Sequence, residues 1–142
     1  PVMFYDFDYF EKLKKLVGDL RLENFIEFSG FIPYSKINDF YKKSDILINL
    51  SPKGGIDKTV LEAMSAGCLI LVANEVFKKY FGDFSQFLIF RYDSPEDLFQ
   101  KIKNLLKLSE DRLKNISNFL QESVEKSHNV SNVVNKISEL FG

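Results

Sequence analysis

Residues 46–73 read ILINLSPKGGIDKTVLEAMSAGCLILVA, and this stretch decides the fold. Its two ends, residues 46–50 and 69–72, are almost wholly apolar, as is typical of strands that are buried on both faces of a parallel sheet. Between them, a polar loop with two glycines leads into a segment of helical spacing, residues 59–66, which ends at Gly67. The stretch therefore predicts a strand, a helix and a second strand parallel to the first.

The alternation of strands and helices continues on both sides of this stretch. Apolar runs predict further strands at residues 2–5, 25–28 and 87–90. Helices are predicted at residues 10–20, 37–41, 74–80, 98–106, 113–120 and 130–140. This order indicates the α/β class, as an open, Rossmann-like domain with a parallel sheet and a helical C-terminal tail. No linker-like segment interrupts the chain, so residues 1–142 are predicted to form one domain.

The composition excludes several classes of protein. With 142 residues, 45% of them apolar, the chain has the length of about one domain. The 19 basic residues nearly cancel the 20 acidic ones, so no excess charge attracts nucleic acid or an anionic membrane. No apolar run approaches the ~18 residues of a membrane span. The single cysteine, Cys68, excludes an internal disulfide and fits a small buried hydrophobe in a reducing compartment, so we expect a cytoplasmic protein.

The loop at residues 51–57 is the segment most suited to binding a ligand. Ligands of parallel α/β sheets bind beyond the carboxyl ends of the strands, and this loop follows such an end. Its adjacent glycines allow a close approach, and the helix after it presents unpaired amides around Lys58, Thr59 and Val60 to an anion such as a diphosphate. The Lys58 or Lys53 ammonium would add attraction. The same pattern also fits a plain strand-to-helix turn that needs flexible residues.

Residues 59–67, TVLEAMSAG, and the CLILVA that follows at 68–73 resemble the donor-site signature of the retaining GT-B glycosyltransferases of family 4, the group 1 family. Three further segments resemble that family in the same order and spacing. They are FEKLKKL at 10–16, FSGFIP at 28–33 and FYKKSDILINLS at 40–51. The resemblance covers almost the whole chain and implies the C-terminal, donor-binding half of a GT-B fold.

The resemblance assigns roles to particular residues. It implies that Glu62 binds the ribose hydroxyls of a nucleotide-sugar, and a carboxylate is chemically suited to accept hydrogen bonds from two vicinal hydroxyls. The donor diphosphate and sugar are expected at Gly55, Ile56, Asp57, Lys58, Thr59 and Val60, and the nucleobase at Gly30, Phe31 and Ile32. No residue is assigned to a metal ion.

Each of these residues also has a purely structural interpretation. Thr59 and Glu62 have the spacing of a capping box, in which the glutamate bonds to the start of its own helix. Asp57 is well placed to be the N-cap of the same helix, and we favour that role over a contact with the sugar. The side chains of Phe31 and Ile32 would serve equally well as core filling.

Two positions depart from the family's pattern. The family has a second glutamate eight positions before Glu62, which contacts the donor sugar, and this chain has Gly54 there. The family's glycine-containing turn after the first strand is replaced by Tyr-Asp-Phe-Asp at residues 5–8. Either the donor sugar therefore differs from the family's, or this edge of the site is not used.

The resemblance implies a glycosyltransferase that uses a nucleotide-diphosphate sugar, such as a UDP- or GDP-sugar, as co-substrate. Transfer would retain the configuration of the sugar and need no metal ion or other cofactor. The family also has an N-terminal acceptor-binding domain and an earlier strand–helix unit, so we expect this chain to be truncated at its N-terminal edge and inactive alone. Two alternatives remain: an inactive transferase-like binding or assembly module, and an unrelated α/β nucleotide-binding domain with another strand order.

Overall fold

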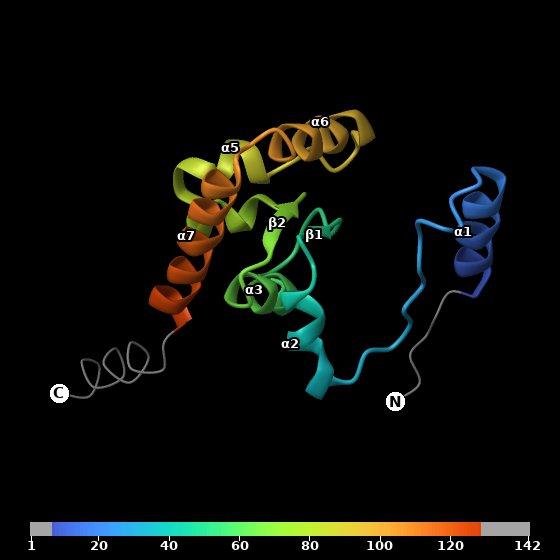
Figure 1. Cartoon of the computed structure of the whole chain (residues 1–142), viewed down its shortest axis with the longest axis horizontal. Helices are drawn as coiled ribbons and strands as arrows, with labels where there is room; N and C mark the ends of the chain where they lie inside the picture. The colour runs from blue at the N-terminus through green and yellow to red at the C-terminus, as the bar shows by residue number, and fades with distance from the viewer. Residues whose placement is uncertain (1–6, 129–142) are drawn as a thin grey trace. The chain divides into compact units, whose positions relative to one another are not determined.

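The computed structural model of the chain describes residues 7–128. Its internal contacts divide the chain into two units, Pro1–Pro33 and Tyr34–Gly142, and each is described by itself (Figure 1). The strand predicted at residues 2–5 and the helical stripe predicted at 130–140 lie outside the described residues.

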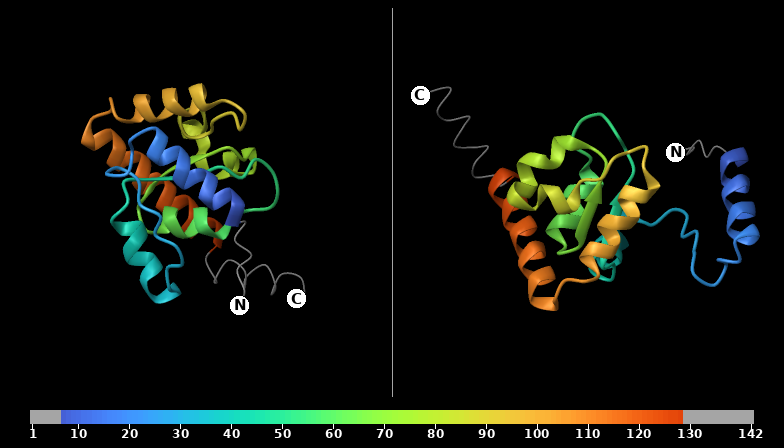
Figure 2. Two further views of the ribbon diagram at one scale, coloured as in Figure 1. Left: turned by 90° about the vertical axis from the view of Figure 1, so that its right-hand side faces the viewer. Right: turned by 90° about the horizontal axis from the view of Figure 1, so that it is seen from above.

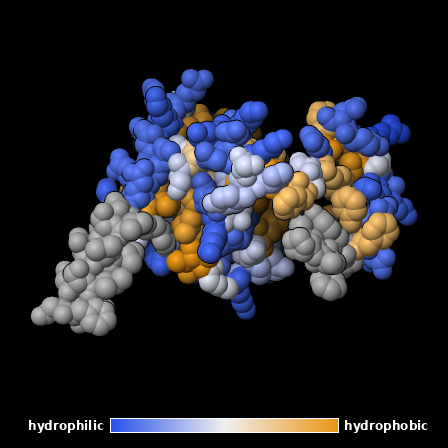
Figure 3. Space-filling model, turned by 90° about the horizontal axis from the view of Figure 1, so that it is seen from below, coloured by the Kyte–Doolittle hydropathy of each residue, from blue (hydrophilic) through white to orange (hydrophobic). Residues whose placement is uncertain are grey.

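The first unit contains helix α1 (Phe7–Asp19), which confirms the helix predicted at residues 10–20. The ring of Phe10 on this helix packs edge-on against the ring of Phe28, with 5.2 Å between the ring centroids. No residue of α1 is buried, and apolar side chains show on the surface of this unit (Figure 3).

The strand predicted at residues 25–28 is wrong. The amides of Phe25 and Ile26 both donate to the carbonyl of Leu22, which forms a turn. The Phe25 side chain is 83% exposed. A strand is stabilised by backbone hydrogen bonds to a neighbouring strand, and in the described part of the chain these residues have none.

The second unit holds a small parallel sheet with helices around it. The sheet and its connecting helices run in the order α2 (Tyr34–Lys42), β1 (Ile46–Asn49), α3 (Lys58–Ser65) and β2 (Leu69–Val72). Four short helical segments follow, η1 (Glu75–Phe77), α4 (Lys78–Phe81), η2 (Gly82–Phe84) and α5 (Ser85–Leu88). Two longer helices, α6 (Pro95–Leu105) and α7 (Glu110–His128), complete the described chain.

Strands β1 and β2 pair in parallel, with Ile46 opposite Leu69 and Asn49 opposite Val72. Helix α3 is the crossover between them, so the strand–helix–strand unit predicted from residues 46–73 is confirmed. In Figures 1 and 2 the strands lie between α3 on one side and α5 and α6 on the other. The carboxyl ends of both strands lead into the loops where a ligand was predicted.

The strand predicted at residues 87–90 is only partly present. Residues 85–88 form α5, and the amide of Ile89 still donates to the carbonyl of Ser85 as in a helix. Ile89 makes an isolated parallel bridge with Val72, and the amide of Phe90 donates to the Val72 carbonyl. A short apolar run fits a buried helix as well as a strand, and here helical bonding takes most of it.

The hydrophobic core of this unit surrounds β2. All four residues of β2 are buried, and they pack with the buried faces of α3 and α7. Two hydrogen bonds tie α7 to the end of α3, from the Ser117 hydroxyl to the Gly67 carbonyl (2.7 Å) and from the Gln121 amide to the Ser65 carbonyl (3.0 Å). Helix α3 is thereby fixed between the sheet and α7.

Candidate functional site

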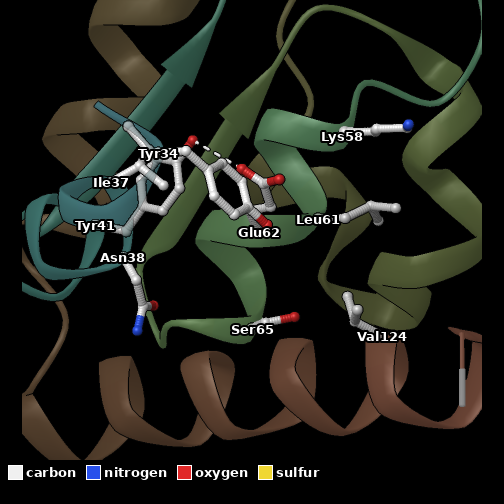
Figure 4. A pocket seen from close by; sticks show the side chains of 9 residues that line it. All are labelled: Tyr34, Ile37, Asn38, Tyr41, Lys58, Leu61, Glu62, Ser65 and Val124. Atoms are coloured by element: carbon white, nitrogen blue, oxygen red, sulfur yellow. Dashed lines mark hydrogen bonds between the residues drawn. The ribbon is translucent and has the colours of Figure 1, made fainter. Parts of the chain in front are cut away.

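A pocket of about 530 Å³ lies over the exposed face of α3. The residues that line it come from α2 (Tyr34, Ile37, Asn38 and Tyr41), from α3 (Lys58, Leu61, Glu62 and Ser65) and from α7 (Val124), as Figure 4 shows. Within α2 and within α3 these residues follow the spacing i, i+3, i+4, i+7, which places them on one face of a helix. The two sets therefore form the walls of one groove.

The exposure of the residues that line the pocket falls from one end of it to the other. The ring of Tyr34, at the start of α2, is 82% exposed. Tyr41, two turns further along the same helix, is 5% exposed, and Val124 is similarly buried. The pocket therefore has an exposed aromatic ring at one end and buried side chains at the other.

Glu62 is the acidic residue of this pocket. Its Oε2 accepts a hydrogen bond from the Tyr41 hydroxyl at 3.4 Å, the dashed line in Figure 4. The N-cap of α3 is Asp57 and not Thr59, so the capping-box interpretation of Thr59 and Glu62 is wrong. The Glu62 carboxylate therefore does not cap its own helix and is available to contact a ligand in the pocket.

The surroundings of Tyr41 keep its hydroxyl protonated. Burial raises the pKa of Tyr41 above its ordinary value of 10.0, and the nearby negative charge of Glu62 raises it further. The hydrogen bond between the Tyr41 and Thr59 side chains lowers this pKa, but it does not reverse the direction. Tyr41 therefore remains a hydrogen-bond donor to Glu62 throughout the neutral range.

Asp57 joins the start of α3 to the end of β1. Its Oδ1 accepts from the amide of Thr59 at 3.0 Å, which confirms its predicted role as N-cap. Its Oδ2 accepts from the side-chain amide of Asn49 at 2.8 Å. The amide of Val60 donates to the Asp57 carbonyl. Two of the amides considered for a diphosphate, those of Thr59 and Val60, thus have partners inside the protein.

Two asparagines that the sequence analysis missed hold the loop at residues 51–57. Asn49, at the end of β1, accepts from the Ser51 amide, and buried Asn74, just after β2, donates to the Gly54 carbonyl at 3.5 Å. Each is a polar residue at the carboxyl end of an apolar strand, and this position was the available signal. The loop is therefore held by the ends of both strands.

Gly54 stands where the family pattern has a glutamate, and its backbone requires glycine. Its φ of 123° lies in a region that other residues rarely adopt. There is open space around the position, so the backbone and not crowding disfavours a side chain there. The conformation of this loop therefore disfavours the glutamate that the family pattern has at this position.

The structure brings together only some of the predicted site residues. Glu62 and Lys58 line the pocket, although the Lys58 side chain extends away from Glu62 in Figure 4. The other predicted donor residues, Gly55, Ile56, Asp57, Thr59 and Val60, form the adjoining loop and first turn of α3. The predicted nucleobase residues, Gly30, Phe31 and Ile32, belong to the first unit, so their role stays a prediction.

Two further properties concern the described residues alone. Between residues 7 and 128, no three His, Cys, Asp or Glu side chains come close enough together to hold a metal ion. Over the same range, no helix is both long enough and apolar enough to cross a membrane.

A parallel strand–helix–strand unit with a pocket over its crossover helix defines an α/β domain. Comparison with protein families gives a match over residues 6–121 to the family described as Glycosyl transferases group 1, and the chain belongs to that family. Comparisons with curated proteins and with solved structures found no significant match.

Membership of this family confirms the predicted resemblance to the group 1 glycosyltransferases and, with the parallel sheet, the predicted Rossmann-like class of the GT-B C-terminal domain. It also assigns the chain to glycosyl transfer in general terms. The alternative of an unrelated α/β nucleotide-binding domain is therefore excluded.

Proposed function

We propose that this chain binds a nucleotide-diphosphate sugar, such as a UDP- or GDP-sugar, in the pocket between α2 and α3. The observation that carries the proposal is Glu62, a half-buried carboxylate that faces the pocket and is not used to cap its helix. Its two oxygens suit the vicinal hydroxyls of a ribose. The pocket volume, about 530 Å³, is in the range of sites for small ligands.

The diphosphate and sugar are proposed to lie beside Gly55–Val60. The helix dipole of α3 and the ammonium of Lys58 offset part of the diphosphate charge. The amides of Gly55 and Ile56 are the best placed to donate, because those of Thr59 and Val60 already bond to Asp57. As the leaving diphosphate gains charge, such donors stabilise it more than they stabilise the bound donor.

From the family resemblance, the nucleobase is proposed to contact the backbone groups of Gly30, Phe31 and Ile32, which would not select one base. Within the second unit, the exposed ring of Tyr34 is a surface on which a base can stack.

In the intact protein, the bound sugar is proposed to pass to an acceptor with retention of configuration and without a metal ion. The acceptor would be held by a separate domain of the longer protein or complex, so the chain alone is expected to have no transfer activity. This part of the proposal rests on the family pattern and on the electrostatic role described for α3.

Calorimetric titration of the protein with UDP, GDP, ADP and their sugars tests the proposed binding. We expect one of these nucleotides to bind and Glu62→Ala to weaken its affinity about tenfold or more, since a charged hydrogen-bond partner is lost. Glu110→Ala, which removes an exposed glutamate from the first turn of α7, is the matched control and is expected to leave the affinity unchanged. Absence of binding at millimolar nucleotide, or equal affinity for Glu62→Ala and the wild type, would contradict the proposal.

A second candidate function is a binding or assembly module without turnover, and Gly54 is the observation that favours it. This chain has no carboxylate where the family pattern has one, and the positive φ at this position disfavours any residue other than glycine. A sugar-transfer assay on the protein together with its acceptor-binding domain separates the two functions. Product formation with a nucleotide-sugar excludes the module, and binding without any product favours it.

A further inference from the structure

The hydroxyl of Tyr41 is a buried polar group whose contact bears on how Glu62 could work. Tyr41 is 5% exposed and comes from α2, while Glu62 comes from α3, 21 positions further along the chain. Among the described residues that line the pocket, Glu62 alone carries a carboxylate. The hydrogen bond from Tyr41 to Glu62 therefore connects the α2 wall of the pocket to the α3 wall.

The direction of this hydrogen bond leaves most of the carboxylate free. An ionised carboxylate has two oxygens and about four positions at which it can accept a hydrogen bond. Tyr41 uses one position on Oε2. Oε1 and the remaining position on Oε2 are left for other donors, and two neighbouring hydroxyls of one ligand can supply both.

The bond also restricts the Glu62 side chain. A glutamate on a helix surface samples several rotamers, and ordering it on binding lowers the affinity. A partner on a second helix selects one of these rotamers before the ligand arrives.

We propose that Tyr41 is a positioning residue that fixes the Glu62 carboxylate to receive a vicinal diol, and so makes the pocket selective for nucleotides with both ribose hydroxyls. The inference rests on the proposed function and adds to it the selection of the sugar of the nucleotide. Tyr41 acts through Glu62 and does not itself contact the nucleotide. The raised pKa of Tyr41 agrees with this role, since the hydroxyl has to stay protonated to donate.

The test compares one nucleotide, whichever of UDP, GDP or ADP binds, with its 2′,3′-dideoxy analogue. The wild type is expected to bind the ribonucleotide about tenfold more tightly than the dideoxy analogue, because the analogue cannot donate to Glu62. Tyr41→Phe keeps the ring and removes the hydroxyl. It is expected to weaken ribonucleotide binding about three- to tenfold and to leave the affinity for the dideoxy analogue unchanged.

A double-mutant cycle shows whether Tyr41 acts through Glu62. In the Glu62→Ala background, Tyr41→Phe is expected to cause no further loss of ribonucleotide affinity. Tyr80→Phe, which alters another buried tyrosine outside the pocket, is the matched control and is expected to preserve the preference for ribose.

The outcomes separate this inference from the proposed function. If Tyr41→Phe weakens both nucleotides equally, or weakens neither, the positioning role is overturned while nucleotide binding stands. If the wild type binds the two nucleotides equally, the selection of a diol is overturned even if Tyr41→Phe fails to fold. If no nucleotide binds the wild type, the proposed function fails and the inference fails with it.

Discussion

At the scale of single residues, Asp57 shows how one side chain serves two elements. One carboxylate oxygen caps α3 through the Thr59 amide, and the other accepts from Asn49 at the end of β1. The helix start and the strand end are thus joined through one residue. The consequence is that the geometry of the loop between them depends on this carboxylate.

Asp57→Ala is expected to lower the free energy of unfolding by about 1–2 kcal/mol, because the amide of Thr59 loses its cap and Asn49 loses its acceptor. Asp57→Ser, which restores a capping oxygen but not the bond to Asn49, is expected to fall between Asp57→Ala and the wild type. Urea denaturation followed by circular dichroism measures both. An Asp57→Ala protein as stable as the wild type would show that the cap contributes nothing.

Tyr41 is expected to make stability depend on alkaline pH. Its pKa is raised in the folded protein, first by burial and then by the charge of Glu62, so folding favours the protonated hydroxyl. The stabilisation is complete below the unfolded pKa of about 10 and is lost as the pH rises through the folded pKa. The free energy of unfolding, measured with urea from pH 8 to 11, should therefore fall more steeply above pH 10 in the wild type than in Tyr41→Phe. Identical slopes would contradict the expectation.

The sequence predicted some of the site residues and not others, and the difference lies in the range of their contacts. The Asp57 cap follows from local spacing around one helix start, which the sequence displays directly. Glu62 was assigned from the family resemblance, because its local spacing indicated a capping box instead. Tyr41 and Asn74 were missed because their partners, Glu62 and Gly54, are about 20 positions away. Contacts at that range depend on how the helices and strands pack, and no local pattern encodes that.

At the scale of elements, the sequence predicted the strand–helix–strand unit of residues 46–73 well because each signal there is local and repeated. Continuous apolar runs, a cap and a terminal glycine all agree. The short apolar runs at residues 25–28 and 87–90 had no such support. The first forms a turn and the second is divided between the end of helix α5 and a bridge to Val72, since a run of four apolar residues fits either structure.

Gly67 ends α3 in a conformation that favours glycine. Its φ is 87°, and a Cβ there would meet Ser117 and Gln121 only at ordinary contact distance. Gly67→Ala is therefore expected to lower the free energy of unfolding by about 1–2 kcal/mol through backbone strain alone. Gly55→Ala, at a glycine without a positive φ and with open space around it, is the control and should change stability little. Thermal melting distinguishes the two, and equal melting temperatures for both variants would contradict this account.

At the scale of the whole molecule, residues 34–128 hold together through a core that β2, α3 and α7 share. Helix α7 closes this core with Ile116, Leu120 and Val124, and Val124 also lines the pocket. The pocket floor and the core are therefore connected through one helix. Helices α2 and α3 form the two walls of the pocket. Because α7 holds α3 in place, α7 also fixes one of these walls.

Leu120→Ala tests the contribution of α7 to the core. Leu120 is fully buried, and its truncation is expected to lower the free energy of unfolding by about 2–5 kcal/mol. Leu106→Ala, at a leucine that is 73% exposed, is the matched control and should change it by about 0.5 kcal/mol or less. Urea denaturation of the two variants makes the comparison, and a small loss for Leu120→Ala would show that α7 packs only loosely.

The central claim is that Glu62 and the groove between α2 and α3 bind the ribose of a nucleotide-sugar. A crystal structure of the protein with the nucleotide that calorimetry shows to bind tests it most directly. The account predicts the two ribose hydroxyls within about 3.2 Å of the Glu62 carboxylate oxygens, with the Tyr41 hydroxyl still bonded to Glu62. A nucleotide bound elsewhere, or bound here with its ribose away from Glu62, would contradict the account.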